Sequence, residues 1–156
     1  MKIEVFTPVV LIVLAAITFS GICAADNVKK LADPIYFDDL EIVFGLETTW
    51  TYIDNQFSDH YMSEVFLLPM YIKNLKDSTH GLNMFDYTQY GSKGTKLDRV
   101  GAYFDGEVTF AGKMRSGATL ETFMAFLYDG NGDYFVEFSK LFGDTVEFGI
   151  NVDRNR

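Results

Sequence analysis

The sequence predicts an all-β protein built as an antiparallel β-sandwich. Aromatic residues make up 16% of the chain and lie, with β-branched residues, in short runs punctuated by Gly, Asn and Asp, a composition typical of strands and turns. No stretch keeps the i, i+3, i+4, i+7 apolar spacing of an amphipathic helix, so we expect little helix. Turn signals recur between the runs, which favours a sandwich and leaves a small barrel as the alternative.

Three strands are expected in the first half of the domain. Residues 36–44 form the first expected strand, in which Leu40, Ile42 and Phe44 alternate with Glu41 and Val43. Residues 48–53 form the second strand and carry the only tryptophan, Trp50. Residues 65–73 are apolar almost throughout, which predicts a strand buried on both faces or one that crosses between two sheets. Pro69 in this run cannot donate a ladder hydrogen bond, so we expect a bulge or an edge position there.

The second half of the domain carries the remaining strands. Residues 84–90 form one, and the glycine-flanked segment 91–96 is its turn, after which residues 97–103 continue the chain. Residues 145–152 alternate apolar and polar side chains and are expected to close the sheet as its final strand.

An Asn-Gly pair predicts a hairpin near the C-terminus. Residues 119–128 and 133–138 are hydrophobic runs on either side of Gly130, Asn131 and Gly132. Asn-Gly between two such runs supplies the positive φ angles of a tight primed turn. We therefore expect these two runs to pair with each other.

The N-terminus predicts a secretory signal segment, residues 1–25, cleaved after Ala25. Lys2 is followed by an apolar run, residues 9–19, and then by small residues. An uncleaved membrane anchor is the alternative, because the apolar stretch 9–25 just reaches the lower limit for spanning a bilayer.

The only cysteine of the chain, Cys23, lies in this segment. Lipidation at Cys23 is disfavoured, since Ile22 precedes it where a small residue is usual. The mature chain would then contain no cysteine and depend on its core for stability. We expect a flexible lead-in over residues 26–34 and one β-sandwich domain over residues 35–156.

The charge balance of the chain argues against two classes of binding partner. Lys and Arg total 13 and Asp and Glu total 22, so the formal net charge is −9, and the isoelectric point is near 4.5. Such a chain lacks the basic surface that neutralises phosphates, so nucleic acid is not an expected partner. Anionic membrane surfaces would repel it.

Three segments carry a resemblance to a known family. Residues 65–74 read VFLLPMYIKN, a long apolar strand that ends in Lys-Asn. Residues 85–97 combine a strand with a glycine-containing turn, and residues 114–126 combine a turn with a strand that ends in Phe, with Ser116 where proline is usual. Over residues 36–152 the chain resembles the immunoglobulin-like domain of bacterial and archaeal secreted proteins and lipoproteins, whose best-known relative is a mycobacterial immunoprotective extracellular antigen.

The resemblance implies an immunoglobulin-like antiparallel β-sandwich preceded by a signal segment. It implies no agreed biochemical activity and no catalytic residues, because its motifs are strand and turn signatures. Relatives are often lipid-anchored, and the misfit at Ile22 argues against that for this chain.

The weak metal candidates are Asp129, Asn131 and Asp133, whose oxygens fall at positions 1, 3 and 5 of a calcium-type loop. Such a loop also needs Gly at position 6 and Glu at position 12, and Tyr134 and Lys140 stand there. A turn explains the same residues, so we predict no metal and no cofactor.

Other side chains suggest chemistry that the sequence does not support further. His60 and His80 lie in polar segments and are too few for a zinc site. Asp38, Asp39 and Glu47 could pair as a glycosidase acid and base, but surface carboxylates are more often solubilising. Aromatic rings could stack on sugars or instead fill the core; these are Trp50, Tyr52, Tyr61, Tyr87, Tyr90 and Tyr103.

We therefore expect a secreted, non-enzymatic binding module for an extracellular protein or glycan. Residues 54–61 and 74–82 are the expected contact loops at the ends of the sandwich. A calcium- or carbohydrate-binding domain is the alternative. Membrane anchoring would run through the N-terminal segment, and an exposed strand edge near Pro69 or in the final strand could pair two copies into a homodimer.

Overall fold

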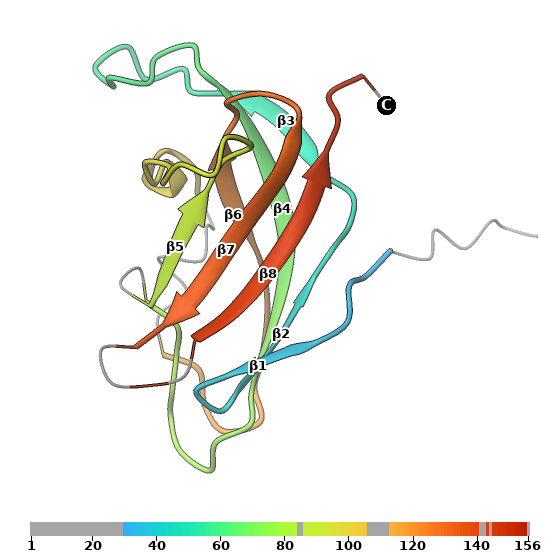
Figure 1. Ribbon diagram of the computed structural model, residues 1–156. Helices are drawn as coiled ribbons and strands as arrows, with labels where there is room; N and C mark the ends of the chain where they lie inside the picture. Colours follow the sequence, from blue (N-terminus) through green and yellow to red (C-terminus); the bar gives the residue numbers. More distant parts are fainter. Residues whose placement is uncertain (1–29, 84–85, 106–112, 141–142, 144, 156) are drawn as a thin grey trace, which may run out of the picture.

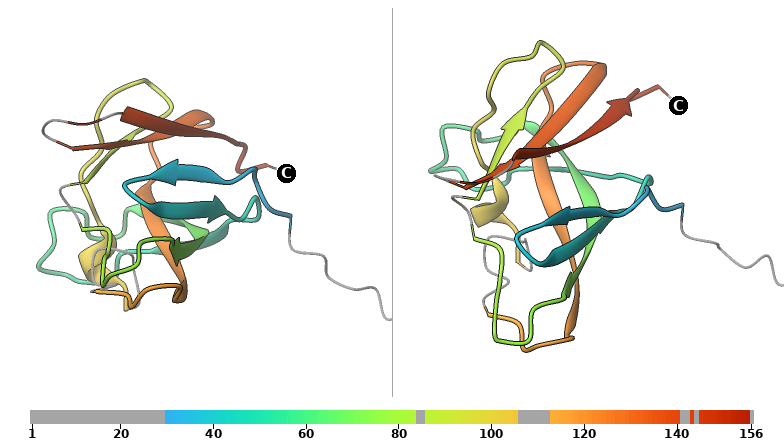
Figure 2. Two further views of the ribbon diagram at one scale, coloured as in Figure 1. Left: turned by 90° about the horizontal axis from the view of Figure 1, so that it is seen from below. Right: turned by 60° about the horizontal axis from the view of Figure 1, so that its bottom comes forward.

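The computed structural model describes residues 30–83, 86–105, 113–140, 143 and 145–155 (Figure 1). Within these residues eight strands form two antiparallel sheets that pack face to face, so the predicted all-β sandwich is confirmed (Figure 2). The helical structure described is one 3-10 turn, η1 (Gly101–Tyr103). The expected signal segment, residues 1–25, lies outside the described residues.

The larger sheet is organised around one central strand, β4. On one edge β4 pairs with β6 over nine residues, and on the other it pairs first with β3 and then with β2. Strand β1 lies at the outer edge of β2. The five strands are β1 (Ile35–Phe37), β2 (Leu40–Phe44), β3 (Thr49–Tyr52), β4 (Glu64–Asn74) and β6 (Thr119–Leu127).

The smaller sheet has the order β5 (Tyr87–Tyr90), β7 (Gly132–Ser139) and β8 (Thr145–Val152). In β8 the apolar side chains point inward at alternate positions, as predicted for the final strand, and pack on the core. Figure 2 shows this sheet lying across the larger one as a separate layer.

Aromatic side chains fill the space between the two sheets. Phe66 of β4 stacks on Phe126 of β6 with ring centroids 5.0 Å apart, and Tyr134 of β7 meets Phe66 edge-on at 4.9 Å. All three side chains are buried. Each such ring contributes about 1.5–3 kcal/mol through burial, so this cluster is a main link between the sheets.

A buried glutamine also joins the two layers. Gln89 of β5 is 2% exposed, and its Nε2 donates a hydrogen bond to the carbonyl oxygen of Ala125 on β6 at 2.8 Å. A buried amide without a partner would cost about 1–3 kcal/mol, so this contact fixes how β5 sits over β6.

Pro69 lies inside the central strand without a bulge. It is in uninterrupted register with Phe123 of β6, and its carbonyl accepts a hydrogen bond from the Gly45 amide at 2.8 Å. The nitrogen and carbonyl of one strand residue point to the same side, so the missing N–H faces the place where β2 ends and the chain passes to β3. Pro69 therefore lies where one edge of β4 has no strand partner, between the residues paired with β3 and those paired with β2.

The single strand expected over residues 36–44 is wrong. A two-residue turn at Asp38 and Asp39 splits it into the hairpin of β1 and β2. Both aspartates have positive φ angles, 49° and 60°, as a tight primed turn requires. Aspartate tolerates this conformation better than most residues, which the alternating pattern alone does not reveal.

The hairpin expected at residues 130–132 is also wrong. Strand β6 pairs with β4, whereas β7 pairs with β5 and β8, so this connection crosses from one sheet to the other. Gly130 and Gly132 have φ angles of 138° and 146°, far from the values of a primed turn. The two glycines therefore allow a change of sheet.

The described part of the expected lead-in, residues 30–34, contacts the larger sheet. The amide of Ala32 donates to the carbonyl of Phe44, and the amide of Leu46 donates to the carbonyl of Lys30, both at 2.8 Å. These bonds hold the segment beside the end of β2.

One buried side chain, Asn74 at the end of β4, holds two neighbouring loops. Its Nδ2 lies within 2.9–3.1 Å of the carbonyls of Ser78, Met114 and Arg115, and its Oδ1 accepts from the amide of Lys76 at 2.9 Å. Asn74 is fully buried, so these groups have little access to water as replacement.

We predict that Asn74→Ala lowers the free energy of unfolding by roughly 2–4 kcal/mol, because several buried backbone groups lose their partner at once. Chemical denaturation measures this, with the exposed Asn155→Ala as the matched control. A loss no larger than that of the control would contradict the role given to Asn74.

Candidate functional site

The loop between β3 and β4 projects from one end of the sandwich (Figure 1). We call residues 54–62 the apex loop. Ile53 and Ser63 stand at its base, where the Ile53 amide donates to the Ser63 carbonyl at 3.2 Å and the Met62 amide donates to the Ile53 carbonyl at 2.8 Å. Ile53 is buried and anchors this base in the domain.

Short-range hydrogen bonds brace the apex loop from within. The Asn55 side chain accepts from the Phe57 amide at 3.0 Å, and the Asn55 carbonyl accepts from the Ser58 amide at 2.9 Å. The hydroxyl of Ser58 accepts a hydrogen bond from the His60 amide at 3.0 Å, and the Ser58 carbonyl accepts one from the Tyr61 amide at 3.1 Å. Asn and Ser favour such local turns, so the sequence itself stiffens the loop.

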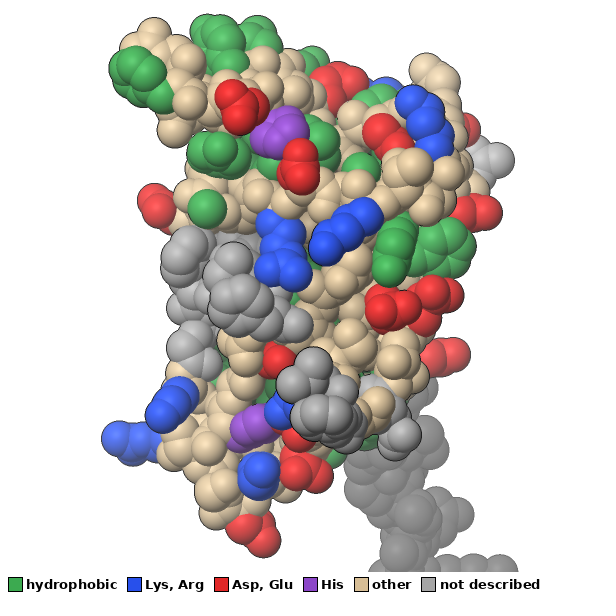
Figure 3. Space-filling model, turned by 60° about the vertical axis from the view of Figure 1, so that its left-hand side comes forward, with side chains coloured by type: hydrophobic (Ala, Val, Ile, Leu, Met, Phe, Trp, Pro, Cys, Tyr) green, Lys and Arg blue, Asp and Glu red, His purple; other side chains and the backbone are tan. Residues whose placement is uncertain are grey.

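The braced loop presents apolar side chains to solvent. Phe57 is 90% exposed, Met62 59% and Tyr61 51%. Figure 3 shows hydrophobic side chains gathered on this projecting end of the molecule. Exposed large apolar side chains gathered on a structured loop make this end of the molecule a candidate interaction site.

Met62 adds backbone strain at the same place. Its φ angle is 63°, in the left-handed region that residues with a side chain seldom adopt. Such a conformation persists only when the surroundings impose it, and it costs of order 1–3 kcal/mol. The hydrogen bond from Met62 to Ile53 imposes it here.

The base of the apex loop rests on a second, smaller core on the outer face of the larger sheet. This core contains Ile53, Val65, Val100 and Ala125. The His60 Nε2 also lies 3.2 Å from Asp98 Oδ2, which ties the loop to the segment before η1. The apex loop is therefore fixed at its base and from one side.

Sequence reasoning placed this loop at a sandwich end but did not single out Phe57 or Met62. The available signal was a large aromatic residue, Phe57, inside a run of polar residues, 54–60. The second expected contact loop, residues 74–82, lies at the opposite end and is held by Asn74.

The structure places Asp129 in a network that closes the turn between β6 and β7. Its Oδ1 accepts from the Ser92 amide, the Ser92 hydroxyl and the Tyr134 hydroxyl at 2.8–2.9 Å. The Tyr134 oxygen also accepts from the Asp129 amide and lies 2.8 Å from the Gly130 carbonyl. A tyrosine that bonds back to the preceding corner is typical of Greek-key sandwiches.

The other two calcium candidates are also bonded within the protein. Asn131 Oδ1 accepts from the Tyr128 hydroxyl and from the Arg154 amide. Asp133 Oδ1 accepts from the Asn151 side chain at 2.6 Å. Within the described residues no group of three or more His, Cys, Asp or Glu side chains could hold a metal ion.

A second carboxylate, Asp38, joins three segments at the opposite end of the domain. Its Oδ2 lies 2.5 Å from His80 Nε2 and forms an ion pair with Lys140. Asp38 is the first residue of the strained β1–β2 turn. The contacts therefore hold a turn conformation that a non-glycine residue adopts at a cost.

Both aspartates have a lowered pKa. Burial raises the pKa of Asp38, but its contacts with Lys140 and His80 lower it by more. Burial likewise raises the pKa of Asp129, and the hydrogen bonds from Tyr134 and Ser92 lower it by more. Burial raises the pKa of the Tyr134 hydroxyl, which therefore stays protonated as a donor.

A folded-state pKa below the unfolded value contributes stability above the unfolded pKa, and that contribution is lost as pH falls through the folded pKa. We predict that the melting temperature falls as the pH drops from about 5 toward 2. The double variant Asp38→Asn, Asp129→Asn should melt lower at neutral pH and lose less on acidification. Equal acid sensitivity of the variant and the parent, measured by calorimetry, would count against this assignment.

The aromatic residues that could stack on sugars lie in different settings. Tyr87 is buried, whereas Tyr52, Tyr61 and Tyr103 are exposed at different loops and strands. The guanidinium carbon of Arg154 lies 4.6 Å from the centroid of the half-buried Trp50 ring.

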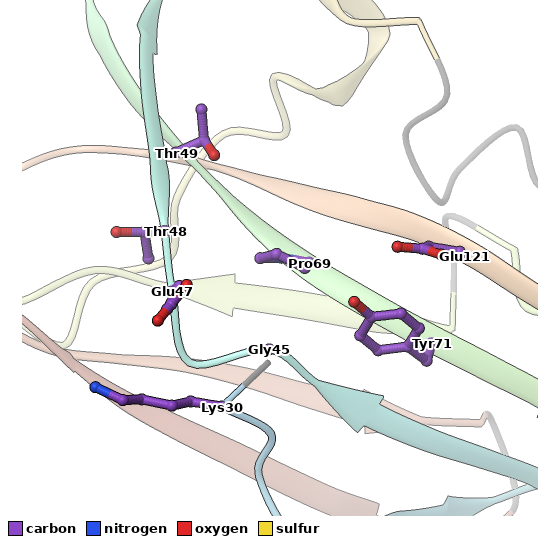
Figure 4. A pocket seen from close by; sticks show the side chains of 8 residues that line it. All are labelled: Lys30, Gly45, Glu47, Thr48, Thr49, Pro69, Tyr71 and Glu121. Carbon is purple, nitrogen blue, oxygen red and sulfur yellow. The ribbon is translucent and has the colours of Figure 1, made fainter. Parts of the chain in front are cut away.

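A hollow of about 370 Å³ lies on the outer face of the larger sheet. Figure 4 shows the rings of Tyr71 and Pro69 side by side on β4, with Glu47 on one side and Glu121 on the other. Asp38 and Asp39, the other candidate carboxylates for a glycosidase pair with Glu47, do not line this hollow.

Comparison with solved structures supports the fold. The candidate lipoprotein ycdA of Bacillus subtilis superposes with a TM-score of 0.57 at 15% identity, over 78% of this chain and 39% of that one. The yjhA protein of Bacillus subtilis superposes with a TM-score of 0.54 at 8% identity, over 80% and 99%. This chain therefore spans well under half the length of ycdA.

No family model and no curated protein matches the sequence. None of the helical structure in the described residues is long and apolar enough to cross a membrane.

Proposed function

We propose that this protein is a secreted binding module that engages a partner protein through the apex loop. One observation carries the proposal: Phe57, 90% exposed, stands at the tip of a loop whose backbone is hydrogen-bonded into one conformation. Preorganisation removes much of the entropy cost of binding, so a braced apolar tip binds more tightly than a loose one. The predicted signal segment supports secretion.

The charges around the tip indicate the chemistry of the partner. Asp54 and Asp59 belong to the apex loop, Asp98 contacts its His60, and the whole chain carries a net charge of −9. The complementary surface is an apolar pocket with a basic rim. Aromatic side chains that fill such pockets dominate the energy of many interfaces.

The test uses a photocrosslinking phenylalanine analogue at position 57 of the full chain in the producing cells. We expect one discrete crosslinked protein. The same analogue at Leu75, which is 45% exposed on the loop after Asn74, should give none.

The purified crosslinked partner then tests the energetics. We predict that Phe57→Ser weakens its affinity by at least about thirtyfold, equal to about 2 kcal/mol, while Leu75→Ser changes it little. The free energy of unfolding of Phe57→Ser should match that of the parent within about 0.5 kcal/mol, since the exposed ring makes few packing contacts. Equal binding by the two serine variants would exclude the apex loop as the contact site.

Carbohydrate binding is a second candidate, and the hollow beside Tyr71 favours it. The rings of Tyr71 and Pro69 offer an apolar floor, and Glu47, Thr48 and Thr49 line one side with polar groups. Sugar rings need this combination of a flat apolar contact and nearby hydrogen-bonding groups.

Affinity electrophoresis with uncharged soluble polysaccharides tests this candidate. The parent protein should migrate more slowly in a gel that contains the bound polysaccharide, and Tyr71→Ala should migrate freely. Unretarded migration of the parent protein in every polysaccharide would exclude carbohydrate binding at this hollow. That result would not affect the proposal for the apex loop.

A further inference from the structure

The outer face of the three-stranded sheet carries an aromatic row beside an acidic row. The aromatic row runs from Tyr90 of β5 through Phe135 of β7 to Gly149 of β8, which are neighbouring register partners. In the next row on the same face, Glu137 of β7 lies opposite Glu147 of β8. We call these five residues the platform. Figure 3 shows hydrophobic side chains bordered by acidic ones at the right of the view.

Gly149 leaves room for the ring of Phe135. A Cβ atom at position 149 would come within 2.9 Å of Phe135 Cε1 and 3.0 Å of its Cδ1, closer than such atoms approach in proteins. Glycine weakens a strand interior and often marks a place where another group approaches closely. Tyr90 and Phe135 remain partly exposed, so the aromatic row is accessible from solvent.

We expect the acidic row to lower the stability of the fold. Carboxylates directly opposite each other on neighbouring strands repel. Among the residues that the structure describes, neither Glu137 nor Glu147 forms an ion pair. The Phe135–Gly149 pair and the repelling Glu137–Glu147 pair are therefore neighbours on the outer face of the sheet. A bound cation would relieve the repulsion and cover the ring.

We propose that the platform binds an arginine side chain of a basic peptide. A guanidinium group is flat, so it can stack on the Phe135 ring while donating hydrogen bonds to Glu137 and Glu147. The net charge of −9 attracts such a peptide from a distance.

The neighbouring charges support this occupant. Asp133 lies on the same face on the other side of Phe135, so carboxylates flank the ring from two directions. Lys96 lies at the far end of the aromatic row, beside Tyr90, and Arg99 bonds to the carbonyl of Tyr87 on the same strand, β5. The platform is thus acidic around Phe135 and Gly149. An organic cation fits better than a metal ion, since the described residues offer no cluster of three ligands there.

The platform acts independently of the apex loop. It lies on β5, β7 and β8, whereas the apex loop joins β3 and β4 of the other sheet. Failure of one proposal therefore leaves the other standing.

The test titrates the ¹⁵N-labelled full chain, at low salt, with a blocked Gly-Arg-Gly-Arg-Gly peptide. A second peptide carries citrulline in place of arginine, which keeps the shape and removes the charge. We expect the arginine peptide to shift the amide signals of Phe135 and Gly149, and the citrulline peptide to leave them unchanged.

Charge-matched variants separate the platform from the general acidity of the protein. Glu137→Gln and Glu147→Gln should each weaken binding about three- to tenfold, and Phe135→Leu should weaken it similarly while keeping an apolar contact. Glu41→Gln is the control, because Glu41 lies opposite Lys73 on the other sheet. It removes the same charge and should leave the affinity unchanged.

The stability of the same variants gives a second readout. Glu147→Gln should melt at a higher temperature than the parent, because it removes the repulsion from Glu137. A carboxylate that lowers stability but supports binding is difficult to explain by a structural role. Equal binding of the citrulline peptide, an equal loss with Glu41→Gln, or shifts confined to other strands would each overturn the proposal.

Discussion

The structure depends on β4, whose backbone pairs on both edges along its length. Strand β6 covers one edge, and β3 and β2 share the other, so the chain must leave the sheet edge between them. Pro69 stands at that point and loses no ladder bond. The two ends of β4 then position the loops at the two ends of the sandwich: the apex loop precedes Glu64, and Asn74 fixes the loops at the opposite end.

Most of the polar groups that suggested chemistry have structural roles. Asp129, Ser92 and Tyr134 close the corner where the chain changes sheet, and Asp38 holds a strained turn through His80 and Lys140. These carboxylates are paired inside the protein, which explains their lowered pKa values. The sites proposed for binding are instead apolar or aromatic surfaces with carboxylates beside them.

The sequence predicted much of the fold and little of the candidate site. Alternation located β2 and β8 because one face of each packs on the core, and a nearly continuous apolar run located β4. Asp38 and Asp39 are adjacent polar residues that interrupt the alternation, and this interruption coincides with the turn between β1 and β2. The Asn-Gly pair misled because the same residues serve a hairpin or a crossing between sheets, and distant pairing decides which. Phe135 lies in an apolar run and looks like a core residue in sequence, and its place in the sheet leaves it partly exposed on the outer face. Phe57 lies in an expected contact loop, and the structure adds that its ring is 90% exposed.

The central claim is that the apex loop is held in one conformation before any partner binds. Amide hydrogen exchange in the free full-length protein tests it most directly, at Ile53, Phe57, Ser58 and Met62, whose amides are hydrogen-bonded. The account predicts exchange at least about tenfold slower than in an unstructured chain at these four positions. Exchange at unstructured rates across residues 54–62 would show a loose loop and contradict the account.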